Sequence, residues 1–174
     1  MSLLLLAYPE LAKDNLESIQ AYRKQYDLQY SFALPHFTIV FAVEDIPAKD
    51  FIEAVKKQSE GFVPFPFAVN KAVSYKDELS PLHYTFLVPA EGMGNIKMLH
   101  DNMYKGIFAP HLQPTVQYLP HITIGSAVDE TISEKIVAVW NDTARPIHST
   151  ITTLDVVLYE NKKLVTLERI TLNK

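Results

Sequence analysis

Leu34-Pro35-His36-Phe37-Thr38-Ile39 is repeated 85 residues later as Leu119-Pro120-His121-Ile122-Thr123-Ile124, and five of the six positions are identical. The separation is close to half of the 174-residue chain. Duplication of a strand-helix-strand-helix-strand unit would produce such a spacing. We therefore expect two similar halves, each contributing one copy of this element.

Each copy is expected to form a β-strand that is polar on one face only. Residues i and i+2 of a strand share a face. His36 should therefore lie beside Thr38, and His121 beside Thr123. The opposite, core-facing side is expected to hold the apolar residues Phe37, Ile39, Phe41, Ile122 and Ile124. An approximate twofold axis between the halves would turn the two polar faces toward each other across a groove.

The other apolar patterns repeat one order of elements in each half. We expect strands near residues 3–8, 37–43, 67–75, 82–88, 121–127, 147–159 and 164–172, with a hairpin turn at 160–163. We expect helices at about residues 10–26, from residue 47, at 95–107 and at 130–142. The predicted fold is α+β (mixed α/β) and bilobal, with seven strands and four helices. Its pseudo-twofold β-α-β-α-β halves would place antiparallel sheets on either side of a central groove.

Prolines add detail to this prediction. Pro64 and Pro66 predict that the third strand lies at a sheet edge or begins irregularly. Pro110 and Pro114 mark a loop ahead of the second motif strand. The fourth strand, which carries His83, is expected to pair with the first strand inside one lobe.

The polar stretch 76–81 breaks the strand pattern and separates the two halves. The halves cover about residues 1–76 and 81–174. We predict that they form a single domain, 1–174, with interleaved lobes.

Composition indicates an ordinary globular protein, with 48% apolar and 21% charged residues. The net charge of −4 does not attract a long polyanion, whereas a small nucleotide or a short RNA end fits it as a partner. Cysteine is absent, which excludes disulfides and thiolate sites. No apolar run approaches the ~20 residues that span a bilayer, so we expect a soluble protein without membrane contact. The lack of cysteine is compatible with a reducing cytosol, and we expect a cytoplasmic monomer.

Two histidines and two hydroxyls around one groove suit the chemistry of a phosphate ester. One imidazole can take a proton from attacking water while the other, protonated, gives a proton to the leaving oxygen. The hydroxyls can bond to the non-bridging oxygens. An ordinary histidine pKa of about 6.5 allows one neutral and one charged ring near neutral pH. We therefore expect neither a metal nor a cofactor.

These paired motifs resemble those of the 2H phosphoesterase superfamily, which includes 2′-5′ RNA ligase-like proteins and cyclic phosphodiesterases. That family is defined by two H-x-[ST] motifs on facing strands of a bilobal fold. The order of elements extends the resemblance over nearly the whole chain. A hydrophobic residue and then an aromatic usually follow the first motif, as Ile39 and Phe41 do here.

The resemblance implies a role for each motif residue. His36 and His121 would be the acid and the base. Thr38 and Thr123 would bind the phosphate. Many ligase-type members also carry an arginine three residues after the second threonine, where this chain has Ser126. A substrate-anchoring cation is therefore missing from the position where the family places one.

The tripeptide alone is not specific, because His83-Tyr84-Thr85 and His148-Ser149-Thr150 match it too. We expect both of these histidines to be structural, although His83 could line the groove without doing chemistry. His100 and His111 have no partner at metal-ligand spacing, so we place them at the surface.

Several other side chains near the motif strands are candidates for substrate contact. Aromatic rings there could stack on a base or equally cap the core. The candidates are Tyr8, Tyr30, Phe32, Tyr118, Ser126 and His83.

Three functions fit these observations, and we expect the first. It is a metal-independent hydrolase that acts on a nucleoside 2′,3′-cyclic phosphate or a related 2′-5′ or cyclic nucleotide diester, with a 2′-phosphate as the product. The second is a non-catalytic protein that binds a nucleotide or phosphate metabolite, which Ser126 favours. The third is an RNA 2′-5′ end-joining enzyme, against which the acidic net charge counts.

Overall fold

A computed structural model describes residues 1–173 except 79, 114, 116 and 144. Strands and helices follow one another in an order close to the predicted one. They are β1 (Ser2–Ala7), α1 (Lys13–Tyr26), β2 (Phe37–Val43), α2 (Ala48–Ser59), β3 (Phe65–Lys76), β4 (His83–Glu91), α3 (Met93–Met103), a 3-10 helix (Gly106–His111), β5 (Ile122–Ala127), α4 (Glu130–Thr143), β6 (Ile147–Ile151), β7 (Thr153–Glu160) and β8 (Lys163–Thr171). Leu79 of the predicted junction and Pro114 of the predicted loop lie outside the described residues.

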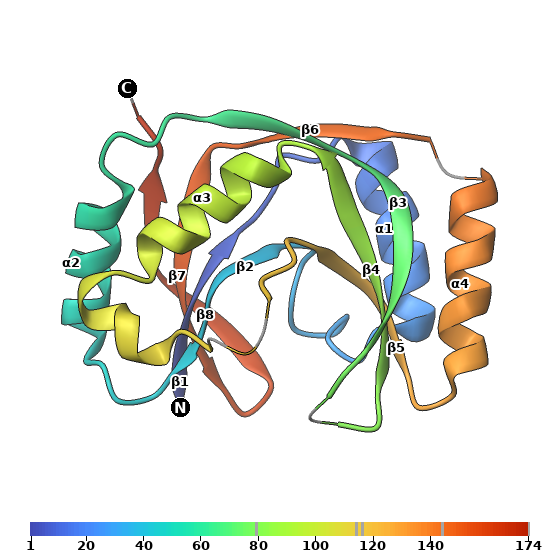
Figure 1. Cartoon of the computed structure of the whole chain (residues 1–174), viewed down its shortest axis with the longest axis horizontal. Helices are drawn as coiled ribbons and strands as arrows, with labels where there is room; N and C mark the ends of the chain where they lie inside the picture. Colours follow the sequence, from blue (N-terminus) through green and yellow to red (C-terminus); the bar gives the residue numbers. More distant parts are fainter. Residues whose placement is uncertain (79, 114, 116, 144, 174) are drawn as a thin grey trace.

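Two four-stranded antiparallel sheets fill the middle of the molecule (Figure 1). Sheet A has the order β2-β1-β7-β8, and sheet B has the order β5-β4-β3-β6. The motif strands β2 and β5 therefore occupy equivalent edges of the two sheets. This arrangement confirms the mixed α+β fold with two antiparallel sheets.

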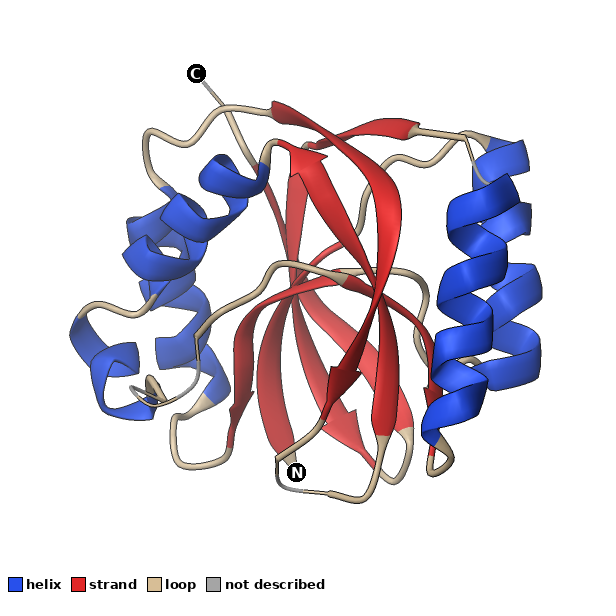
Figure 2. Cartoon of the chain, turned by 45° about the vertical axis from the view of Figure 1, so that its right-hand side comes forward, coloured by secondary structure: helices blue, strands red, loops and turns tan. Residues whose placement is uncertain are grey.

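Helices cover the outer faces of both sheets, α2 and α3 on one side and α1 and α4 on the other (Figures 1 and 2). The faces without helices turn toward each other, and we call them the inner faces. Helix α1 comes from the first half of the sequence but packs on β5 of the second. Among the residues described, no helix has both the length and the apolar composition needed to cross a membrane.

The structure corrects three details of strand arrangement. The segment 147–159 forms two strands rather than one, because the chain leaves sheet B at Thr152 and enters sheet A. The prediction that the His83 strand pairs with the first strand is wrong: β4 pairs with β3 and β5, while β1 pairs with β2 and β7. Strand β3 lies inside its sheet rather than at an edge, but its entry is irregular as predicted: Pro66 pairs only with β6, because β4 begins to pair with β3 at Ala68.

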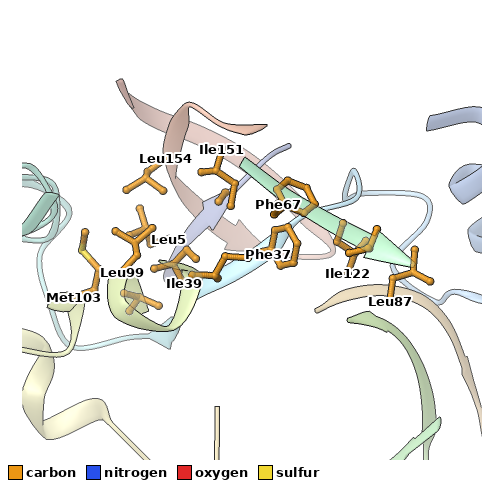
Figure 3. Packing of buried hydrophobic residues seen from close by; sticks show 14 of the residues in the cluster. Leu5, Phe37, Ile39, Phe67, Leu87, Leu99, Met103, Ile122, Ile151 and Leu154 are labelled. Carbon is orange, nitrogen blue, oxygen red and sulfur yellow. The ribbon is translucent and has the colours of Figure 1, made fainter. Parts of the chain in front are cut away.

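One hydrophobic core lies beneath the helices and runs from one sheet to the other. Under α3, Leu99 and Met103 pack near Leu5 and Ile39 of sheet A (Figure 3). Between the sheets, the ring of Phe37 meets that of Phe67 edge-on, with centroids 5.0 Å apart (Figure 3). The apolar residue of the first motif thus joins the two lobes.

A β-bulge interrupts β2 directly after its motif threonine. Thr38 lies opposite Leu6 of β1. The preceding residue of β1, Leu5, lies opposite Val40, so Ile39 is an extra residue.

The second motif strand repeats this irregularity at the equivalent position. Thr123 of β5 lies opposite Phe86, and Gly125 lies opposite Thr85, so Ile124 is the extra residue. The two motif strands therefore share a bulge as well as a sequence. Bulges are common beside active sites because they redirect neighbouring side chains.

The first bulge also overturns one predicted core position. Simple alternation from Phe37 and Ile39 would bury Phe41. Because the bulge shifts the alternation, Val40 is buried instead and Phe41 is 47% exposed.

Candidate active site

The two motif histidines make the same hydrogen bond. Nδ1 of His36 lies 2.7 Å from the carbonyl oxygen of Leu34, and Nδ1 of His121 lies 2.7 Å from that of Leu119. A carbonyl oxygen only accepts, so Nδ1 of each neutral ring carries the proton. Nε2 of each ring is therefore the nitrogen that can take up or release a proton during reaction.

An aromatic ring packs against each motif histidine. Phe86 of β4 stacks on His121 with ring centroids 3.6 Å apart and an angle of 18°. Tyr8 meets His36 edge-on, with centroids 5.9 Å apart. Each imidazole is thus held by a backbone carbonyl and by a neighbouring ring.

Burial lowers the pKa of both histidines. The pKa of His121 falls to about 4, chiefly through burial, while its bond to Leu119 acts in the opposite direction. Positive charge on His36 lowers the pKa of His121 further, which brings the two rings into one electrostatic site. Double protonation is therefore disfavoured.

The pKa of His36 is also lowered, first by burial, against the effect of its bond to Leu34. Two charged side chains act on the pKa of His36 in opposite directions: Arg23 lies in α1, and Asp27 directly follows this helix. Arg23 lowers this pKa, and Asp27 raises it.

Both motif threonines lie on the inner faces of their sheets. Residues directly opposite each other share a face, so Thr38 projects with Leu6 and Thr123 projects with Phe86. Both threonine side chains are partly exposed, as are those of His36 and His121. Each lobe therefore offers one imidazole and one hydroxyl to the space between the sheets.

Three side chains from residues 100–118 bind the outer edge of β2. Tyr118 donates a 2.8 Å hydrogen bond to the Thr38 carbonyl, and Nδ1 of His100 donates a 2.9 Å bond to that of Ile39. The hydroxyl of Tyr104 accepts a 3.0 Å bond from the backbone N–H of Phe41. These bonds satisfy backbone groups that an edge strand would otherwise leave unpaired.

His100 is therefore not a surface residue, contrary to the prediction. Its side chain is buried and stacks on Tyr118, with centroids 3.6 Å apart at 7°. His111 is partly buried, with its ring 3.5 Å from a carboxylate oxygen of Asp45. These contacts could not be predicted from the local sequence, because Tyr118 and Asp45 each lie more than 15 residues from the histidine that they contact.

The histidines of the two other H-x-T tripeptides, His83 and His148, lie away from the motif pair. His83 is buried on the α4-covered face of sheet B, where Lys76 donates a 3.2 Å bond to its Nε2 and Glu130 lies 3.8 Å away. It therefore does not line the inner face. His148 is exposed on β6.

The loop between α1 and β2 contacts both sheets. Ser126 Oγ accepts a 3.3 Å bond from the Leu28 backbone N–H and donates a 3.5 Å bond to the Tyr26 carbonyl. Phe32 packs on Tyr159 of β7, with centroids 5.8 Å apart. Tyr30 is 36% exposed, and its predicted contact with substrate stays a prediction.

Sequence reasoning missed a buried ion pair behind His36. Nε of Arg23 donates to Asp27 Oδ2 at 2.7 Å, and both side chains are 1% exposed. The sequence does contain a pattern that indicates this pair, because Arg23 lies four residues after Ile19 on the apolar face of α1. Opposite charges four residues apart on a buried helix face indicate such a pair.

A cavity of about 350 Å³ opens beside the second motif. Its lining residues are Tyr75, Glu78, Lys97, Thr115, Gln117, Tyr118 and Leu119. Tyr75 stacks on Phe86 with centroids 5.3 Å apart, so aromatic rings lead from the cavity to His121. Over the described positions, no three His, Cys, Asp or Glu side chains are grouped to hold a metal ion.

Residues 8–163 match the family model of the 2′-5′ RNA ligase superfamily. The chain therefore belongs to this family, within the 2H phosphoesterase superfamily. A Staphylococcus haemolyticus protein named "Putative phosphoesterase" is 28% identical over 127 residues, 72% of each chain. An Oceanobacillus iheyensis protein of the same name is 26% identical over 115 residues, 65% of this chain and 64% of its own length, just under two thirds.

Solved structures share the fold. A crystal structure of a Thermus thermophilus protein matches with a TM-score of 0.63 and 15% identity over 99% of this chain and 98% of that one. E. coli LigT in apo form matches with a TM-score of 0.61 and 16% identity, over the same shares of the two chains. LigT complexed with 3′-AMP matches with a TM-score of 0.60 and 15% identity, again over 99% and 98%.

Proposed function

We propose that this protein is a phosphodiesterase that hydrolyses a nucleoside 2′,3′-cyclic phosphate or a related 2′-5′ or cyclic nucleotide diester. The observation that carries the proposal is the matched pair of histidines. Each donates Nδ1–H to a carbonyl 2.7 Å away, which leaves both Nε2 atoms available for proton transfer. Names of relatives and the binding of 3′-AMP by E. coli LigT agree with a phosphate ester as substrate.

In the proposed reaction, His121 is the base and His36 is the acid. Nε2 of neutral His121 takes a proton from water as the water oxygen bonds to phosphorus. Protonated His36 gives its Nε2 proton to the 3′-oxygen as the bond from phosphorus to that oxygen breaks. The product is a 2′-phosphate, and proton exchange with solvent restores both rings.

Repulsion between the two rings supports a site that holds a single proton. Charge on His36 lowers the pKa of His121, so a singly protonated site with its proton on His36 keeps His121 neutral. Thr38 and Thr123, one in each lobe, are the hydroxyl donors to the non-bridging oxygens.

A substrate screen tests the proposal. Wild-type protein is incubated in chelator with 2′,3′-cyclic nucleotides, 2′-5′ dinucleotides and 3′-5′ cyclic nucleotides, and phosphorus NMR assigns each product. We expect turnover of the 2′,3′-cyclic esters to 2′-phosphates. Tight binding in calorimetry without any product would instead favour a nucleotide-binding protein, and joined 2′-5′ ends would favour a ligase.

A further inference from the structure

Arg169 and Asp155 form an ion pair on the inner face of sheet A. Nε of Arg169 donates to Oδ1 at 2.8 Å, and Nη2 donates to Oδ2 at 2.7 Å. The carboxylate of Asp155 is 1% exposed, whereas the Arg169 side chain is 62% exposed. The buried acid thus holds the guanidinium in one orientation while its outer edge stays accessible.

Strand register places this pair in one row with a motif threonine. Thr38 lies opposite Leu6, Leu6 opposite Asp155, and Asp155 opposite Arg169. Directly opposite residues share a face, so all four side chains project toward sheet B. At about 4.8 Å per strand, the row spans about 14 Å between its end Cα atoms. The Arg169 side chain leans back toward Asp155, which shortens the gap to Thr38.

Tyr8 connects this row to the first histidine. Its ring meets His36 at 5.9 Å. Burial raises the pKa of the Tyr8 hydroxyl, the charge of Asp155 raises it further, and the charge of Arg169 lowers it. Tyr8 therefore contacts His36 and lies within the electrostatic influence of the ion pair.

The equivalent row of sheet B carries no charge. There, Thr123 lies opposite Phe86, which lies opposite Val73. The two lobes thus repeat the imidazole and hydroxyl but differ further along the row, where sheet A has Leu6, Asp155 and Arg169 and sheet B has Phe86 and Val73. A ligand with a second anionic group would be oriented by this difference.

Stability alone gives weak reason for this pair. The Arg169 side chain is 62% exposed, and ion pairs with an exposed partner contribute little to stability. A guanidinium fixed by a carboxylate, with N–H groups still accessible, is suited to bind phosphate oxygens in a defined geometry.

We propose that Arg169 binds a phosphate of the substrate other than the one that reacts, so that the site selects nucleotides carrying a second phosphate. Arg169 then supplies, from β8, the anchoring cation that is absent at Ser126. This inference rests on the proposed function for its orientation of the substrate, with the reacting phosphate at Thr38. Asp155 acts as a positioning residue for Arg169.

A binding experiment tests the proposal without requiring turnover. Isothermal calorimetry compares adenosine 2′,5′-bisphosphate with adenosine 2′-monophosphate on the wild type and on Arg169→Gln. Lys56→Gln is the matched control, because Lys56 pairs with Glu168 on the opposite face of β8 at 2.6 Å. Thermal unfolding confirms that each variant is folded.

We expect the wild type and Lys56→Gln to bind the bisphosphate about tenfold more tightly than the monophosphate, a difference of about 1.4 kcal/mol. Arg169→Gln should lose most of this ratio while its affinity for the monophosphate changes less than about twofold. The double variant Asp155→Asn/Arg169→Gln, which leaves no buried charge unpaired, should behave in the same way.

An unchanged ratio in Arg169→Gln, or an equal loss for both ligands, would overturn the proposal, as would a wild type that binds neither. If the ratio shifts as expected but the wild type hydrolyses no diester, the anion site stands and the hydrolase proposal fails.

Discussion

The hydroxyl of Tyr118 donates a 2.8 Å hydrogen bond to the carbonyl oxygen of Thr38, so the segment leading into the second histidine motif holds the strand of the first. His100 stacks on Tyr118 and binds the next carbonyl along, that of Ile39. Burial raises the pKa of Tyr118 far above its usual range, so the hydroxyl keeps its proton. The two motifs are thus linked by direct contacts as well as by symmetry.

Tyr118→Phe should reduce kcat more than it raises KM, because the lost bond holds the backbone of Thr38 in β2. Removing one hydrogen bond of this kind costs about 0.5–1.5 kcal/mol, which corresponds to a decrease in kcat of about two- to tenfold. Steady-state kinetics on a 2′,3′-cyclic nucleotide, together with thermal unfolding, measures both effects. Lower stability with an unchanged kcat would show that the bond serves folding alone.

The pH dependence of kcat/KM should be bell-shaped with an acidic maximum. Activity rises as His121 loses its proton near pH 4 and falls as His36 loses its proton below its usual pKa of 6.5. Rates measured in chelator at constant ionic strength from about pH 3.5 to about pH 9 define both limbs. A profile that keeps rising above about pH 7 would contradict the assignment of two histidines with lowered pKa values.

Asp27→Asn should destabilise the fold strongly, because it leaves the Arg23 charge buried without its partner. We expect a loss of about 3 kcal/mol in the free energy of unfolding, measured in urea. Glu17→Gln is the control, since Glu17 pairs with Lys13 at the same spacing on the same helix but at 66% exposure. It should cost less than about 0.5 kcal/mol.

The same Asp27 variant has a second, electrostatic readout. Because Asp27 raises the pKa of His36, its neutralisation should move the alkaline limb of the pH profile to lower pH. Equal stability losses in the two variants, or a limb that does not move, would show that this pair has no special role beside His36.

Gly92→Ala should be more harmful than Gly61→Ala. Both glycines have positive φ, +76° and +81°. A Cβ on Gly92 would lie 2.5 Å from the Pro66 carbonyl oxygen, whereas one on Gly61 would meet nothing within 4 Å. We expect a cost of about 1 kcal/mol at Gly61 from backbone strain and about 2–4 kcal/mol at Gly92, where overpacking adds to it. Similar unfolding midpoints for the two variants would refute this account of the turn before α3.

The duplicated motif made much of the fold predictable. Alternation of polar and apolar residues predicted that His36 and Thr38 share one face of a strand; Thr38 lies in β2 opposite Leu6, whereas His36 is the residue directly before β2. The hairpin turn at 160–163 was predicted from polar residues, and Asn161 and Lys162 have positive φ, as a tight two-residue turn requires.

Bulges and long-range contacts could not be predicted from local patterns. The extra residue at Ile39 reverses the alternation after it, and no local residue preference marks that position. The pairing of Asp155 with Arg169 depends on the β7–β8 register, which shifts between Val156 and Val157. Residues that complete a site from distant strands therefore needed the three-dimensional structure.

The most direct test of the central claim is the activity of single histidine variants on a 2′,3′-cyclic nucleotide in chelator. His36→Ala and His121→Ala should each lower kcat/KM by about 10²–10⁴-fold, because each removes one of the two proton-transfer groups. His148→Ala, which removes an exposed histidine from a matching H-x-T tripeptide, should stay within about twofold of the wild type. Full activity in either His36→Ala or His121→Ala would contradict the two-histidine mechanism.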